Sequence, residues 1–305
     1  MASSAQPPSR LLAKDEDWQP AFIYGTAWKK EKTRELVKMA VEKGFRSVDT
    51  AAQPKHYQEQ LVGEALREVY EGGKINRGSI YLQTKYTTPG GQDLNNMPYD
   101  ASAPLETQIR TSVATSLKNL RPRSDSENGS YVDCLLLHSP LPTVEQTIDA
   151  WRILESYVPD KIRALGISNV TLPVLEVIYE NSTIKPSVVQ NRFYPQTRYD
   201  VPLRAFCEEH GIAYQSFWTL TGNPHLLKAE PVTALSEAAG VNRSVALYAL
   251  VMDQGIVVLN GTTSAEHMEE DFTGISRVRE WAMSQGNEWH KIVQGFQAAL
   301  QLKAL

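Results

Sequence analysis

The chain is predicted to adopt an α/β fold, a single (β/α)8 TIM barrel. Its 305 residues fall within the size range of that fold. Eight short apolar segments alternate with stretches of helical periodicity, and this alternation is typical of parallel strands joined by right-handed crossovers. No G-x-G-x-x-G motif follows any of these segments, so the glycine fingerprint of an open dinucleotide-binding sheet is missing. Eight units in this length favour a closed barrel.

Composition narrows the class of protein. Hydrophobic residues make up 42% and charged residues 22%, which suits a large core and little disorder. The net charge of −4 argues against nucleic acid as a partner. The two cysteines, Cys134 and Cys207, suggest neither a disulfide framework nor a metal site. The N-terminal residues lack the apolar segment of a signal peptide, and no apolar run is long enough to span a membrane. We therefore expect a cytoplasmic protein with no membrane association.

Four strands are expected in the first half, at residues 22–28, 46–51, 79–85 and 132–137. The helices between and after them are expected at 31–43, 58–70, 104–120 and 144–157. In the first helix Leu36, Met39 and Ala40 fall on one face, and Gly44 suits the position just after the helix end. The polar loop at 86–103 has the length of loops that usually serve function.

The second half continues the same alternation. Strands are expected at 161–168, 187–191, 212–218 and 255–260. Helices are expected at 172–179, at 201–210, at 235–252 with a break near Gly240, and from about Ala265. Residues 1–305 thus form one barrel domain, with a short polar leader at about residues 1–20 and a helical C-terminal segment at 289–300.

Three ionisable residues stand at the ends of expected strands: Asp49, Lys85 and His138. Each alone has a structural explanation, as a cap, a solvated rim charge or a core histidine. Together they lie at the end of the barrel where catalysis takes place. Tyr57 follows the second strand, and a nearby ammonium is expected to lower the pKa of its phenol while the carboxylate holds the lysine. The phenol can then donate a proton to a carbonyl oxygen, which a neutral histidine orients.

Motifs in a fixed order link these residues to a known family. They are GTAW at 25–28, VDTA with Asp49, Val62-Gly63, LQTK with Lys85, LLLHSP with His138, GISN at 166–169 and VVQN with Gln190. In order and spacing the chain resembles the aldo-keto reductases over nearly its whole length. The resemblance implies an NAD(P)H-dependent carbonyl reductase that reduces an aldehyde or ketone by hydride transfer. It implies Asp49, Tyr57, Lys85 and His138 as the catalytic residues.

The resemblance also implies a cofactor site. Ser168, Asn169 and Gln190 are expected to hold the nicotinamide carboxamide, and Phe217 is expected to stack on the ring. The loop after the seventh strand is expected to contact the pyrophosphate through its backbone. The full expected set is Gly25, Thr26, Ser168, Asn169, Gln190, Ser216, Phe217, Trp218, Thr219, Leu220, Gly261, Thr262, His267, Glu270 and Asp271.

The proton donor departs from the family pattern. Tyr57 follows Asp49 by eight residues, further than in the family, and counting back from Val62-Gly63 without a gap puts His56 at the tyrosine position. We expect Tyr57 to be the donor, because a neutral imidazole beside Lys85 donates a proton less readily.

The expected phosphate site departs as well. The family grips the 2′-phosphate of NADP with a Lys-Ser pair and an arginine after the eighth strand. Here those positions are Gly261, Thr262 and His267, with Glu270 and Asp271 nearby. We therefore expect NADP(H) as the cofactor with weakened preference over NAD(H), and a distant cation such as Arg243 in place of the missing ones.

Two other functions remain open from the sequence. One is a cofactor-binding barrel that acts as a sensor or regulatory subunit with little turnover. The other is a Schiff-base aldolase using Lys85, which Asp49 argues against. The expected partner is a small carbonyl substrate, and the chain is expected to be a monomer or a dimer.

Overall fold

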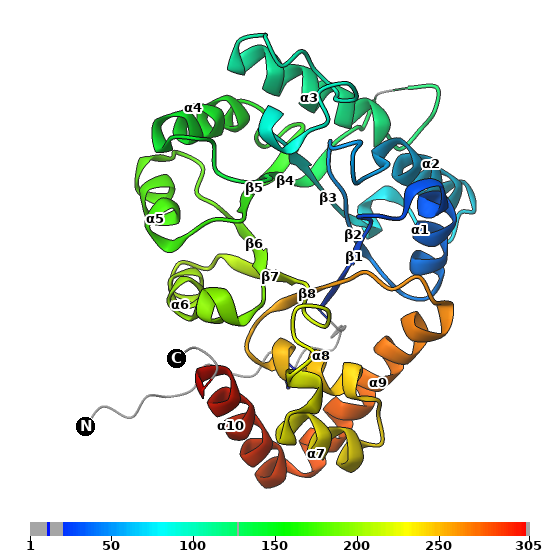
Figure 1. Ribbon diagram of the computed structural model, residues 1–305. Coiled ribbons are helices and arrows are strands. Elements are labelled where there is room, and N and C mark those ends of the chain that lie inside the picture. The colour runs from blue at the N-terminus through cyan, green and yellow to red at the C-terminus, as the bar shows by residue number, and fades with distance from the viewer. Residues whose placement is uncertain (1–10, 13–20, 127, 303–305) are drawn as a thin grey trace.

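The computed structural model describes residues 11–12, 21–126 and 128–302, and eight parallel strands close into a barrel in them (Figure 1). Their order around the barrel is their order in the chain, and β1 closes the ring by pairing with β8, Phe22 opposite Val258. This confirms the predicted (β/α)8 fold. The strands are β1 Phe22–Gly25, β2 Ser47–Asp49, β3 Tyr81–Tyr86, β4 Val132–Leu137, β5 Ile162–Ser168, β6 Val188–Arg192, β7 Ala213–Phe217 and β8 Val257–Asn260.

The helices lie outside the ring of strands (Figure 1). They are α1 Thr33–Glu42, α2 Glu59–Glu71, α3 Leu105–Asn119, α4 Val144–Glu155, α5 Leu172–Asn181, α6 Val201–Glu209, α7 Glu230–Ala239, α8 Arg243–Asp253, α9 Ala265–Ser284 and α10 Gly286–Leu302. The helical stretch expected at 235–252 is two helices and begins earlier than expected. Gly240, with φ 63°, ends α7, and the Asn242 side chain accepts the Val245 N–H to cap α8.

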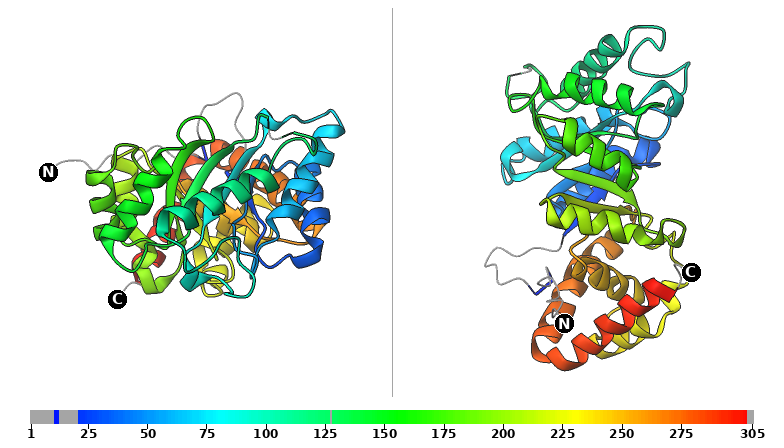
Figure 2. Two further views of the ribbon diagram at one scale, coloured as in Figure 1. Left: turned by 90° about the horizontal axis from the view of Figure 1, so that it is seen from above. Right: turned by 90° about the vertical axis from the view of Figure 1, so that its left-hand side faces the viewer.

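The last four helices pack together beyond one side of the barrel, as the right-hand view of Figure 2 shows. Helix α7 contacts α8, α9 and α10, and α8 contacts strand β8. The expected C-terminal helix is therefore present, and it is longer than residues 289–300. The expected leader lies outside the described residues except for Leu11 and Leu12. Leu11 is buried, and its carbonyl oxygen accepts a 3.1 Å hydrogen bond from Arg279 Nε.

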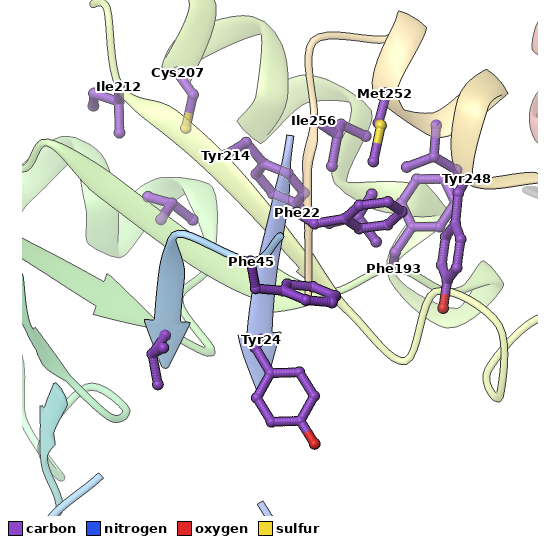
Figure 3. Packing of buried hydrophobic residues seen from close by; sticks show 14 of the residues in the cluster. Phe22, Tyr24, Phe45, Phe193, Cys207, Ile212, Tyr214, Tyr248, Met252 and Ile256 are labelled. Carbon is purple, nitrogen blue, oxygen red and sulfur yellow. The ribbon is translucent and has the colours of Figure 1, made fainter. Parts of the chain in front are cut away.

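Aromatic side chains fix β1 against α8 and α9. The Phe22 ring lies 5.2 Å from that of Tyr248, edge to face (Figure 3). It also lies 5.5 Å from the ring of Phe272, again edge to face. The Tyr24 ring lies 5.4 Å from that of Phe45. Beyond the core, Tyr24 donates a 3.0 Å hydrogen bond to the carbonyl oxygen of Thr262. The mouth of the barrel is thus held in place where β1 meets β8.

Among the described helices, none combines the length and the apolar character needed to cross a membrane.

Candidate active site

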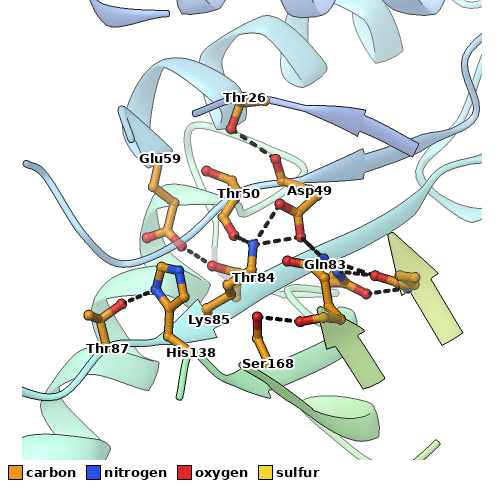
Figure 4. A network of polar contacts seen from close by, with 12 residues as sticks. Thr26, Asp49, Thr50, Glu59, Gln83, Thr84, Lys85, Thr87, His138 and Ser168 are labelled. Atoms are coloured by element: carbon orange, nitrogen blue, oxygen red, sulfur yellow. Dashed lines mark hydrogen bonds and ion pairs between the residues drawn. The ribbon is translucent and has the colours of Figure 1, made fainter. Parts of the chain in front are cut away.

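An ion pair lies at the carboxyl ends of β2 and β3. Lys85 Nζ is 2.6 Å from both carboxylate oxygens of Asp49 and donates a 2.9 Å hydrogen bond to the carbonyl oxygen of Thr50 (Figure 4). Both side chains are buried, each residue being 1% exposed. A pair removed from water in this way requires further hydrogen bonds to offset desolvation.

Two glutamines supply those hydrogen bonds, and a third holds both of them. Asp49 Oδ1 accepts from Gln83 Nε2 at 2.6 Å and from Gln190 Nε2 at 3.1 Å. Both glutamines also donate to Gln215 Oε1, each at 2.9 Å. The carboxylate is therefore oriented by strands on both sides of the barrel, and this network fixes the position of Lys85.

Tyr57 joins this pair from the loop after β2. Lys85 Nζ lies 5.2 Å from the centre of the Tyr57 ring, and the His138 ring lies 5.9 Å from it, edge to face. The His56 ring packs against Trp28, with 3.7 Å between the ring centres, and both residues line the same cavity as Tyr57 and His138. The structure therefore brings Asp49, Tyr57, Lys85 and His138 together, and it places His56 in the wall of the same cavity.

The pKa of Tyr57 shifts in the direction opposite to the one expected. Burial raises the pKa of the phenol, and the negative charge of Asp49 adds to the effect. The expected net lowering of this pKa is therefore wrong, because burial outweighs the attraction of the Lys85 ammonium, which Asp49 largely offsets at 2.6 Å. Burial also lowers the pKa of Lys85, although Asp49 opposes that shift. Tyr57 thus keeps its proton at neutral pH.

His138, directly after β4, is neutral. Burial, with a contribution from the Lys85 charge, lowers the pKa of His138 to about 3. Its Nδ1 lies 2.6 Å from the hydroxyl of Thr87, a residue that the sequence analysis did not identify (Figure 4). Asn169 Nδ2 donates a 2.9 Å hydrogen bond to the His138 carbonyl oxygen. The side chain and the backbone of His138 are both held, and the structure gives Nε2 no partner among the described residues.

These groups open into a cavity of about 1030 Å³. That volume is at the upper end of the roughly 300–1,000 Å³ typical of small-molecule sites. Most of the expected site residues line it: Gly25, Asp49, Tyr57, His138, Ser168, Asn169, Gln190, Phe217, Trp218, Thr219, Leu220, Gly261, Thr262, His267, Glu270 and Asp271.

Three expected site residues do not line the cavity. Lys85 is buried below it. Thr26 is also buried, because its hydroxyl donates a 2.9 Å hydrogen bond to the Asp49 carbonyl oxygen. Ser216 is buried with its hydroxyl 2.8 Å from that of Thr219. The side chains of Thr26 and Ser216 thus support residues that line the cavity, and contact of these two residues with a cofactor stays a prediction.

The backbone is unusual at three lining residues. Trp28, Asn169 and Trp218 have φ values of 64°, 54° and 59°, in the left-handed region that non-glycine residues seldom adopt. Trp28 is 65% exposed and Trp218 52% exposed, so both stand at the rim. Strained backbone persists where surrounding structure enforces it, and it gathers at functional sites.

Several residues that line the cavity were not predicted from the sequence, among them Lys29, Arg192, Asn242 and Ser244. Lys29 donates a hydrogen bond from Nζ to the carbonyl oxygen of Gly261, and burial lowers its pKa. A cation distant in the sequence therefore lies beside Gly261. Arg243, the suggested substitute, is exposed and does not line the cavity. Lys29 directly follows the GTAW motif, and that adjacency was the available signal.

In the part of the chain that the structure describes, no group of three or more His, Cys, Asp or Glu side chains is placed to hold a metal ion.

Comparison with known proteins gives a consistent result. Residues 18–279 match the sequence model of the Aldo/keto reductase family. The NAD/NADP-dependent indole-3-acetaldehyde reductase of Schizosaccharomyces pombe is 28% identical over 268 residues, covering 82% of this chain and 84% of that protein. The glyoxal reductase of Bacillus subtilis is 30% identical over 228 residues, covering 74% and 71%.

Solved structures share the fold. The aldo/keto reductase of Brucella melitensis superposes with a TM-score of 0.66 at 22% identity, covering 86% of this chain and 95% of that chain. A Bombyx mori aldo-keto reductase in complex with NADP superposes with a TM-score of 0.67 at 20% identity, covering 91% and 94%.

Proposed function

Since the chain belongs to the aldo/keto reductase family and is an NAD(P)H-dependent carbonyl reductase, we propose that it reduces an aldehyde or ketone to an alcohol with Tyr57 as the general acid. The single observation that carries this assignment is that the Tyr57 ring lies close to both the Lys85 ammonium, at 5.2 Å, and the His138 ring, at 5.9 Å. A general acid must hold its proton at the working pH and be placed to release it to the reacting oxygen. The raised pKa of Tyr57 meets the first condition.

His138 and Lys85 have separate roles in this proposal. The proposal assigns the Thr87 hydroxyl as the donor to Nδ1, 2.6 Å away, which leaves the proton of the neutral imidazole on Nε2. That N–H donates to the substrate carbonyl oxygen and orients it toward Tyr57. As Tyr57 loses its proton, the ammonium of Lys85 stabilises the phenolate that forms. Asp49 holds Lys85 in position.

The cavity fits a nicotinamide dinucleotide. The Asn169 Oδ1 atom is buried without a hydrogen-bond partner, so it suits the N–H of a carboxamide. Gln190 Nε2 is already engaged by Asp49 and Gln215, which leaves only its Oε1 for a ligand. Phe217 offers a ring face, and the loop at 218–221 offers backbone groups to the pyrophosphate. When bound, the reduced nicotinamide supplies the hydride.

The far end of the cavity bears on the choice of cofactor. Lys29 and the Thr262 hydroxyl lie near the first turn of α9, a helix of 20 residues whose N-terminus favours anions. Glu270 and Asp271 line the same end and oppose a phosphate. We propose NADP(H) as the cofactor, held chiefly by Lys29, with NAD(H) as a usable alternative.

The other candidate functions have less support. A sensor with little turnover is not supported, since the relatives with named activities are reductases. A Schiff base on Lys85 requires an uncharged amine free to attack, whereas Asp49 accepts from its Nζ at 2.6 Å. The expected cytoplasmic location stays a prediction.

Kinetics of Tyr57→Phe test the proposal. We expect kcat to fall by roughly 10²–10⁴-fold, the usual contribution of general acid catalysis, while the Kd for NADPH barely changes. His56→Ala is the matched control and is expected to keep most of the activity. Near-normal turnover in Tyr57→Phe together with an inactive His56→Ala would transfer the role to His56.

A further inference from the structure

Arg192 presents an unpaired positive charge to the cavity. It is the last residue of β6 and lines the cavity with Tyr57 and His138. Its guanidinium carbon lies 4.8 Å from the centre of the Trp218 ring and 5.5 Å from that of Phe217. Its Nε is buried without a hydrogen-bond partner, and among the described residues no carboxylate forms an ion pair with it. Stacked arginines use the ring faces for support and keep the guanidinium edge for ligands.

The other charges near the catalytic groups are offset. Lys85 is paired with Asp49 at 2.6 Å, and His138 is neutral. The acids that line the cavity, Glu270 and Asp271, belong to α9 after β8, whereas Arg192 belongs to β6. Among the described residues on the catalytic side of the cavity, Arg192 therefore carries a charge that no ion pair offsets.

The position of Arg192 suits a substrate rather than the far end of a cofactor. It lies opposite Phe217 in the register of β6 and β7, and Phe217 is the residue proposed to face the nicotinamide. A second cavity of about 430 Å³ shares Arg192 and Asn169 with the first. Asp200 also lines that second cavity, but its Oδ2 accepts from Asn191 at 2.7 Å and from Tyr214 at 3.0 Å. Its Oδ2 is thus engaged by these two neighbours, and among the described residues no ion pair joins Asp200 to Arg192.

We propose that the substrate is an anionic carbonyl compound, an aldehyde or ketone that also bears a carboxylate, and that Arg192 binds the carboxylate. The guanidinium edge matches a carboxylate with two parallel charge-assisted hydrogen bonds. This inference rests on the proposed function, because it names the substrate class of the same site.

Matched substrates and variants test the inference. 4-Carboxybenzaldehyde and its methyl ester differ in charge but share the aldehyde and the ring. For Arg192→Gln we expect kcat/KM with the acid to fall by about 10- to 150-fold, the range for loss of a charge-assisted hydrogen bond. We expect the value with the ester to change by no more than about threefold and the Kd for NADPH to be unchanged. Arg192→Lys should recover part of the loss. Arg198→Gln, at an exposed arginine just after β6, should behave as the wild type.

Three outcomes would overturn the inference, and they differ from one another. An equal loss for acid and ester in a folded Arg192→Gln protein would make Arg192 structural. A weakened NADPH affinity with an unchanged acid-to-ester ratio would assign Arg192 to the cofactor. In both cases the wild type still reduces aldehydes, so the proposed function stands. If the wild type oxidises NADPH with neither compound nor with any aldehyde of a broad panel, the proposed function fails as well.

Discussion

Replacement of Lys29 by glutamine is expected to weaken binding of NADPH more than binding of NADH. The Nζ of Lys29 has a neutral partner, the carbonyl oxygen of Gly261, and burial already lowers the pKa of this ammonium. A phosphate beside it restores the favourable electrostatic environment that burial removes. The two cofactors differ only in the 2′-phosphate, so their comparison isolates that contact.

The size of the effect follows from one charge-assisted hydrogen bond. Such a bond contributes about 1.5–3 kcal/mol, and about 1.4 kcal/mol corresponds to a tenfold change in Kd. The Kd for NADPH is therefore expected to rise by about 10- to 150-fold, nearer the lower limit because Lys29 is partly exposed. Loss of the neutral bond to Gly261 costs about 1 kcal/mol at most and affects both cofactors alike.

Quenching of tryptophan fluorescence provides the assay, since Trp28 and Trp218 both line the cavity. Titrations are compared at one ionic strength, because salt screens exposed charges. Lys30→Gln is the matched control: Lys30 is the exposed neighbour and does not line the cavity. If Lys29→Gln raised both Kd values by the same factor, or neither, the reasoning about the 2′-phosphate would be refuted.

Three further predictions concern charge in the cavity. The pKa of His138 is about 3 in the folded protein against about 6.5 when unfolded, so the unfolded state binds more protons between these values. The contribution of neutral His138 to the free energy of unfolding is complete above about pH 6.5 and falls by at most about 1.4 kcal/mol per pH unit below it. In His138→Gln, the free energy of unfolding measured in urea should therefore decrease less as the pH is lowered. Burial raises the pKa of Asp271 to about 6, so this carboxyl becomes anionic above that pH and Asp271→Asn should tighten NADPH binding at pH 8 but not at pH 5. Lys29→Gln and Arg192→Gln should act independently. For kcat/KM with the acid substrate, converted to free energy, the change in the double variant should equal the sum of the changes in the two single variants. A deviation from that sum above about 0.5 kcal/mol would mean that both cations contact one ligand.

The barrel could be predicted because its signals are local. Each strand core is a short apolar run, and each expected strand is present within a few residues. The ends of helices were predicted less accurately where apolar residues were the only local signal. The stretch from Glu230 to Asp253 is rich in apolar residues throughout, so its division depends on Gly240 and on the Asn242 cap.

The site residues with a local sequence signal could be predicted, and those placed by contacts between strands could not. Asp49, Lys85 and His138 were identified because each stands at the end of an apolar run, where a parallel barrel places catalytic side chains. Thr87 and Arg192 follow or end strands too, but nothing in their local sequence indicates contact with a histidine or with two aromatic rings. Those contacts depend on the register of neighbouring strands.

The direction of the Tyr57 pKa shift could not be predicted from the sequence for a related reason. A lysine and a tyrosine in proximity suggest a lowered pKa, but the sign depends on how much of the lysine charge is already offset and how little water remains. Both quantities are properties of the assembled network of Asp49, Gln83 and Gln190.

The distribution of charge around the cavity gives a physical reason for two separate binding ends. Lys85 and Asp49 form an ion pair with no net charge next to the catalytic groups. This pair therefore attracts neither the cofactor phosphate nor the substrate carboxylate. Lys29 follows β1, whereas Arg192 ends β6, and these two strands are not neighbours in the barrel. A cofactor phosphate at Lys29 and a substrate carboxylate at Arg192 therefore repel each other little. In the proposed mechanism, that separation leaves the substrate carbonyl between Tyr57 and His138, where Tyr57 donates its proton.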